Sequence, residues 1–69
     1  MNNTGIKYRK VAKVLVENGW HEVRQNGSHV IWGKNGIRIS IANRPDGVNR
    51  MIVRRLFREN NIPLDGIHC

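Results

Sequence analysis

The chain has 69 residues, which is enough for one small domain and leaves no room for a second. Twelve lysines and arginines against five aspartates and glutamates give a net charge of +7, which predicts polyanionic partners. A lone cysteine excludes an internal disulfide, and the absence of nucleotide-binding glycine motifs and long apolar runs argues against cofactor enzymes and membrane proteins. We therefore expect a single domain over residues 1–69 that works in the cytoplasm without a metal or organic cofactor.

The first periodic segment, residues 7–18, has apolar side chains at helical spacing with lysines and arginines between them. This spacing predicts an amphipathic helix whose apolar side faces the core. The asparagine-glycine pair at residues 18–19 predicts the end of the helix, because glycine adopts the left-handed conformation without a steric cost.

After the helix, apolar and polar residues alternate, which predicts three short strands at about residues 20–25, 28–33 and 37–42. Asparagine-glycine pairs separate these strands and favour two tight hairpins. If Asn26-Gly27 forms the first turn, Arg24 lies opposite His29, and Arg38 shares their face of the sheet. That face is mostly polar, whereas the opposite face is rich in valine and isoleucine and is expected to face the core.

The start of the first strand departs from this pattern. Strict alternation places His21 on the core side and Trp20 on the polar side, which is unfavourable for both side chains. We therefore expect a twist or a bulge there.

Residues 49–60 form the last periodic segment and predict a second amphipathic helix with Met51, Ile52 and Leu56 on its buried side and Val53 and Phe57 as further candidates for that side. The order helix, three strands, helix predicts an α+β fold in which both helices cover one face of a three-stranded antiparallel sheet. The double-stranded-RNA-binding domain has this layout, and it binds backbone phosphates and 2′-hydroxyls.

Several short motifs occur in a fixed order along the chain: Gly19-Trp20, Gly27-Ser28-His29, Gly36, Arg38-Ile39-Ser40-Ile41, and a second helix that ends in Asn-Asn-Ile. With this arrangement the chain resembles the HicA family of toxins, and the likeness spans residues 7–64. The resemblance implies a double-stranded-RNA-binding fold, an endoribonuclease that cleaves mRNA without a metal, and silencing by a partner antitoxin, HicB.

Matched position by position, the resemblance gives the catalytic role to His29, with Gly27 and Ser28 as its frame. The chemistry of the residues points the same way. The 2′-oxygen of RNA can attack the adjacent phosphate, so a catalyst needs a group that moves protons and cations that stabilise the phosphoryl oxygens. We expect RNA contacts from one serine and five basic residues: Arg24, Ser28, Lys34, Arg38, Arg44 and Arg54.

The chain departs from the family in the loop after the third strand, where residues 42–48 lack the second histidine that members usually carry. Two alternatives therefore remain: an RNA-binding module that does not cut, which includes a diverged inactive relative, and a domain whose basic face binds an acidic protein. For His21 and His68 we expect no chemical task. Their spacing from His29 and Cys69 fits no metal-ligand pattern.

Overall fold

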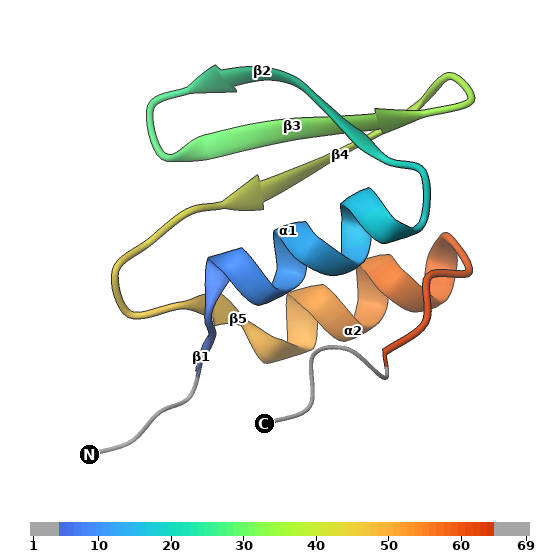
Figure 1. Ribbon diagram of the computed structural model, residues 1–69. Coiled ribbons are helices and arrows are strands. Elements are labelled where there is room, and N and C mark those ends of the chain that lie inside the picture. The colour runs from blue at the N-terminus through green and yellow to red at the C-terminus, as the bar shows by residue number, and fades with distance from the viewer. Residues whose placement is uncertain (1–4, 65–69) are drawn as a thin grey trace.

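The computed structural model describes residues 5–64, which form two helices and five strands (Figure 1). In chain order they are β1 (Gly5–Ile6), α1 (Tyr8–Glu17), β2 (His21–Asn26), β3 (His29–Lys34), β4 (Ile37–Ala42), β5 (Val48–Asn49) and α2 (Arg50–Glu59). Strands β2, β3 and β4 form an antiparallel sheet with β3 in the middle, and β1 pairs with β5 in a separate short ladder. Both helices lie along the same face of the three-stranded sheet, which confirms the predicted α+β fold.

The core lies between the sheet and the two helices. Its buried side chains are Ile6, Val11, Val14, Leu15, Trp20, Val30, Trp32, Ile39, Ile41, Val48, Val53, Phe57 and Ile62. Val11 and Leu15 on α1 repeat at the four-residue spacing that places side chains on one helix face, as do Val53 and Phe57 on α2. Each fully buried side chain of this size contributes roughly 1.5–3 kcal/mol through the removal of apolar surface from water.

The buried side of α2 differs from the prediction in part: the candidates Val53, Leu56 and Phe57 pack in or against the core, but Met51 and Ile52 do not. Val53 and Phe57 face the core, whereas the side chains of Met51 and Ile52 are 78% and 43% exposed. Successive helical residues are rotated by roughly 100°, so once Val53 faces the sheet the two residues before it must point elsewhere. The prediction that Met51 and Ile52 belong to the core was therefore wrong.

The first hairpin has a different register from the expected one. Asn26 pairs with His29, so the turn consists of residues 27–28 rather than of the asparagine-glycine pair. The turn glycine has a φ of 65°, as the first position of a type II′ turn requires. Arg24 therefore lies opposite Ile31. The prediction that it pairs directly with His29 was wrong, although the two residues do share a face.

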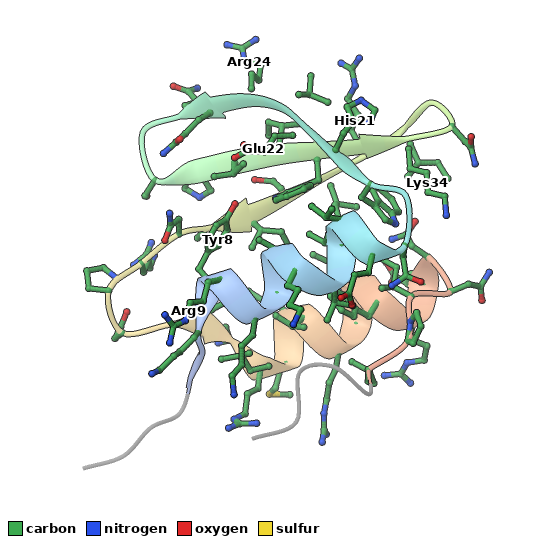
Figure 2. The ribbon with its side chains drawn as sticks, in the orientation of Figure 1. Tyr8, Arg9, His21, Glu22, Arg24 and Lys34 are labelled. Atoms are coloured by element: carbon green, nitrogen blue, oxygen red, sulfur yellow. The ribbon has the colours of Figure 1, made fainter. Side chains whose placement is uncertain are left out.

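The irregularity expected at the start of the first strand is confirmed as a bulge between Glu22 and Arg24. The bulge reverses the alternation of the residues before it. Trp20 is buried in the core, and His21 is exposed and pairs with Gly33. In Figure 2, Arg24 points away from the helices, whereas Glu22 lies on the side of the strand toward Tyr8 of α1.

Candidate functional site

The helices leave one face of the three-stranded sheet uncovered, and we call it the open face. Its side chains form three cross-strand rows. Counted from the first hairpin, the rows are Asn26, His29 and Ala42; then Arg24, Ile31 and Ser40; then His21, Gly33 and Arg38. Neighbouring rows are about 7 Å apart, because each strand rises about 3.4 Å per residue. No carboxylate lies in these rows.

His29 is the first residue of β3, and its side chain is exposed in the first row. Backbone and side-chain hydrogen bonds hold the turn before it. The Ser28 carbonyl accepts a hydrogen bond of 2.6 Å from the Asn43 amide, and the side-chain amide of Gln25 donates to the Gly27 carbonyl over 3.1 Å. The imidazole is thus attached to a fixed point at the end of the sheet.

A groove of about 830 Å³ passes His29 at the edge of the sheet. Its lining residues are Gly5, His29, Ser40, Ala42, Arg44, Asp46, Gly47, Val48, Asn49, Arg50, Met51 and Ile52. Strand β4 forms the sheet edge here, and its residues Ser40 and Ala42 are small. The imidazole of His29 therefore reaches the groove across β4 as well as the open face.

Cationic and apolar groups share the lining of the groove. Arg44 comes from the loop after β4 and Arg50 from the first turn of α2, and both are exposed. Asp46 is the one carboxylate among the described residues of the lining. Met51 and Ile52 supply the exposed apolar surface. Guanidinium groups bind phosphate oxygens in bidentate fashion, and an apolar surface suits an unstacked base.

The short β1–β5 ladder and the cap of α2 hold the far wall of this groove. Gly5 pairs with Asn49, whose side-chain oxygen accepts hydrogen bonds of 2.9 and 3.2 Å from the amides of Met51 and Ile52. The β1–β5 ladder that forms this wall was not predicted from the sequence. The available signal was the Pro-Asp-Gly turn followed by an asparagine in front of a helical pattern, which is typical of a helix start.

The family comparison agrees with the geometry. A family model described as the HicA toxin of bacterial toxin-antitoxin systems matches residues 8–62. This chain belongs to the HicA toxin family. The match runs from the start of α1 to the buried Ile62 and includes His29 and most of the groove lining. The comparisons with curated proteins and with solved structures found no match.

Within residues 5–64, neither helix is long and apolar enough to cross a membrane. The same residues contain no group of three or more histidine, cysteine, aspartate or glutamate side chains placed to hold a metal ion.

The predicted RNA-binding residues of the sheet and its loops lie at different distances from His29. Arg44 shares the groove with it, and Ser28 precedes it in the turn. Arg24 is one row away on the open face, whereas Arg38 is two rows away, about 13 Å along β3. One phosphate at His29 therefore lies within reach of Arg44 and Arg24 but not of Arg38.

The remaining two predicted residues lie outside the groove and the open face. The ammonium of Lys34 donates a hydrogen bond of 2.7 Å to the carbonyl of Asn18 at the end of α1. It thereby satisfies a carbonyl that the helix itself leaves without a partner. Figure 2 shows the Lys34 side chain near that end of the helix. Arg54 is exposed on α2, one helical turn beyond Arg50, and extends the positive charge along the helix.

A buried polar cluster lies on the core side of the sheet, away from the groove. The hydroxyl of Tyr8 and the indole nitrogen of Trp32 are both buried without a well-formed hydrogen bond among the described residues. Burial raises the pKa of the Tyr8 hydroxyl; the Trp32 indole lowers it by less, and the negative charge of Glu22 adds to the rise. This cluster is structural in character, because it faces α1 rather than the open face.

Proposed function

We propose that this HicA-family chain is a single-domain, metal-independent endoribonuclease that cleaves mRNA in the cytoplasm as the toxin of a toxin-antitoxin pair. One observation carries the proposal: the exposed imidazole of His29 lies where the open face meets a groove of ligand size. Arginines lie on both sides of it, Arg24 on the open face and Arg44 with Arg50 in the groove.

The proposed reaction uses the RNA as its own nucleophile. His29 accepts the proton of a 2′-hydroxyl while the 2′-oxygen forms a bond to the adjacent phosphorus. The bond from phosphorus to the 5′-oxygen breaks, the leaving oxygen takes up a proton from water, and the imidazolium of His29 returns its proton to water. The products are a 2′,3′-cyclic phosphate and a 5′-hydroxyl. Histidine suits this step because the pKa of an imidazole is ordinarily close to working pH.

The arginines serve the charge that develops on the phosphoryl oxygens. Arg44 and Arg50 approach from the groove and Arg24 from the open face, so a phosphate beside His29 meets guanidinium groups on two sides. Positioned cations of this kind stabilise the transition state because they need no reorganisation during the reaction. Met51 and Ile52 offer a neighbouring base an apolar contact.

Silencing by a HicB-like antitoxin fits the same geometry. The groove and the first row of the open face are accessible, so the active imidazole has no cover within the described part of the chain. A partner that fills the groove and neutralises Arg44 and Arg50 would exclude RNA by steric and electrostatic means. We propose that the antitoxin binds over His29.

The test is a cleavage assay on single-stranded RNA in the presence of EDTA, with the wild-type chain and His29→Ala. We expect the variant to lose about 10²–10⁴-fold of the cleavage rate, which is the usual contribution of general acid-base catalysis. His68→Ala is the matched control, because it removes one imidazole from a position with no assigned role. Equal cleavage by wild type and His29→Ala would contradict the catalytic assignment.

The second candidate function is RNA binding without cleavage, and the loop after β4 is the observation that favours it. That loop contributes Arg44 and Asp46 to the groove in place of a second histidine. A salt-sensitive gel shift with intact RNA, in the same assay, would support the binding module and exclude the nuclease.

A further inference from the structure

The third row of the open face contains a histidine and an arginine on either side of a glycine. His21 on β2 and Arg38 on β4 are the two partners of Gly33 on the central strand. A Cβ atom placed on Gly33 would lie 3.7 Å from Nε2 of His21, so the imidazole tip leans over the glycine toward β4. The same Cβ would lie 2.9 Å from Cγ2 of Val23, which therefore forms an apolar floor beside the ring.

The bulge in β2 creates this arrangement. Without it, His21 would point into the core side, and the third row would have no second polar group. His21 and Arg38 are both exposed, and neither has an ion-pair partner among residues 5–64. The described carboxylates lie on α1, on α2, in the loop after β4 and, as Glu22, on the other side of β2. The row therefore offers two hydrogen-bond donors, and no carboxylate on the open face neutralises the positive charge of Arg38.

We propose that His21 and Arg38 bind a backbone phosphate of the RNA strand that is several nucleotides away from the phosphate cleaved at His29. This inference rests on the proposed function, since it assumes that RNA is the substrate. Arg38 supplies a planar pair of N–H donors for the phosphate oxygens, and the His21 imidazole supplies another donor from the opposite strand.

The position of the groove explains why the strand would reach this row. The groove lies on one side of His29, and the open face is the exposed surface on which the rest of the strand continues in this proposal. On that path it passes Arg24 and the half-buried side chains of Ile31 and Val23 before it reaches the third row. Apolar contacts for sugars and bases thus alternate with cations for phosphates.

The distance along the sheet sets the length of RNA that the proposal requires. His29 and Gly33 are four residues apart on β3, which corresponds to about 13 Å. At about 3.4 Å per nucleotide a stacked strand would cover this distance with about four nucleotides, and an extended strand with fewer. RNA that is too short to span the two rows gains nothing from His21 and Arg38.

The experiment is a length series. Single-stranded oligoribonucleotides with one cleavable site, all other 2′-hydroxyls blocked by methylation, are extended one nucleotide at a time on the 5′ side or on the 3′ side. In one of the two series, we expect KM for the wild-type chain to fall by about tenfold when the strand reaches the third row, as for a hydrogen bond to a charged group. Arg38→Ala should remove that drop and leave kcat within about twofold, and His21→Ala should remove part of it.

Arg55→Ala is the matched control, because it removes one exposed arginine of α2 outside the groove and the open face. It should keep the full length dependence. A wild-type chain that shows no drop in either series, or an Arg38→Ala variant that keeps the drop, would overturn the third-row site while cleavage itself upholds the nuclease. If nothing is cleaved, fluorescence anisotropy on the same oligoribonucleotides decides: the same length dependence of the Kd supports the site, and its absence overturns it. If Arg38→Ala and His21→Ala weakened the binding of the antitoxin but not the binding of RNA, the third-row site would also be overturned.

Discussion

His29 and His21 are the two histidines of the open face, and they differ in what lies around them. His29 lies at the end of the sheet, beside small residues of β4 and a groove with two arginines. His21 lies two rows away, leans over a glycine and faces one arginine across it. We therefore propose that the histidine at one end of the face reacts with the RNA and that the histidine at the other end only binds it.

The comparison shows that exposure and residue type do not define a site. Both imidazoles are exposed, but the imidazole of His29 lines the groove and that of His21 does not. A proton-transferring group needs the reacting phosphate held against it on several sides, and a binding group needs one contact.

The same substitution at His29 and at His21 tests directly whether the two histidines differ in role. His29→Gln keeps a polar side chain but cannot move a proton at neutral pH, so we expect kcat to fall by about 10²–10⁴-fold. His21→Gln should leave kcat within about twofold and raise KM for long RNA. Steady-state kinetics on one long oligoribonucleotide measure both. A fall in kcat of similar size for both variants would show that the two ends do not differ in role.

Two glycines allow the ends to be compared in stability. Gly33→Ala places a Cβ 2.9 Å from Val23 Cγ2, a branched side chain with little room to move, and should cost about 1–3 kcal/mol of unfolding free energy. Gly27→Ala has no neighbour within 4 Å but a φ of 65°, so it should cost about 1–2 kcal/mol through backbone strain. Urea denaturation measures both costs. We expect Gly33→Ala to shift the length dependence of RNA binding and Gly27→Ala to reduce kcat; the reverse assignment would contradict the proposed roles.

The wall of the groove can be loosened without a change in the third row. Asn49→Ala removes the cap that accepts hydrogen bonds from the first turn of α2, and should cost about 1 kcal/mol of unfolding free energy. Because Arg50, Met51 and Ile52 belong to that turn, kcat/KM should fall for short and long RNA alike. Asn49→Ser retains a capping oxygen and is the control. A loss of kcat/KM for long RNA alone would contradict the proposed position of the RNA in the groove beside His29.

The smallest effect is expected from the core side of the sheet, which serves neither end. Burial raises the pKa of Tyr8 above its ordinary value of 10.0, so the folded state holds this proton more tightly than the unfolded state. The resulting stability is fully present below pH 10 and is lost as the pH rises through the raised value. The melting temperature should fall less steeply from neutral to alkaline pH for Tyr8→Phe than for wild type. Cleavage at neutral pH should not change, and a clear loss there would link this cluster to the site.

The elements of the fold were predictable because their signals are local. The helical spacing of apolar residues predicted α1 and α2, and the second asparagine-glycine pair predicted a tight hairpin with a loop of two or four residues. The pairing of Lys34 with Ile37 shows that the loop has two residues. The β1–β5 ladder was missed because each strand has two residues and the pairing joins segments from opposite ends of the chain. No local periodicity marks so short a pair.

The register of the first hairpin was missed for a related reason. Either Asn26-Gly27 or Gly27-Ser28 can form a two-residue turn, since each supplies a glycine for the positive φ. Both turns place Arg24 and His29 on the same face, so the pattern of apolar residues does not distinguish them. The structure selects the second turn and moves Arg24 one row away from His29.

By itself the sequence determined the order of the helices and strands, the excess of positive charge, the likeness to the HicA family and the exposure of His29 on the polar face. These follow from spacing, turn chemistry and composition, which act between near neighbours. Tertiary structure decided the groove, the separation of Arg38 from His29 and the position of His21. Those features depend on how β1, β4 and the start of α2 come together and on one extra residue in β2, and such contacts between distant segments leave no periodic trace in the chain.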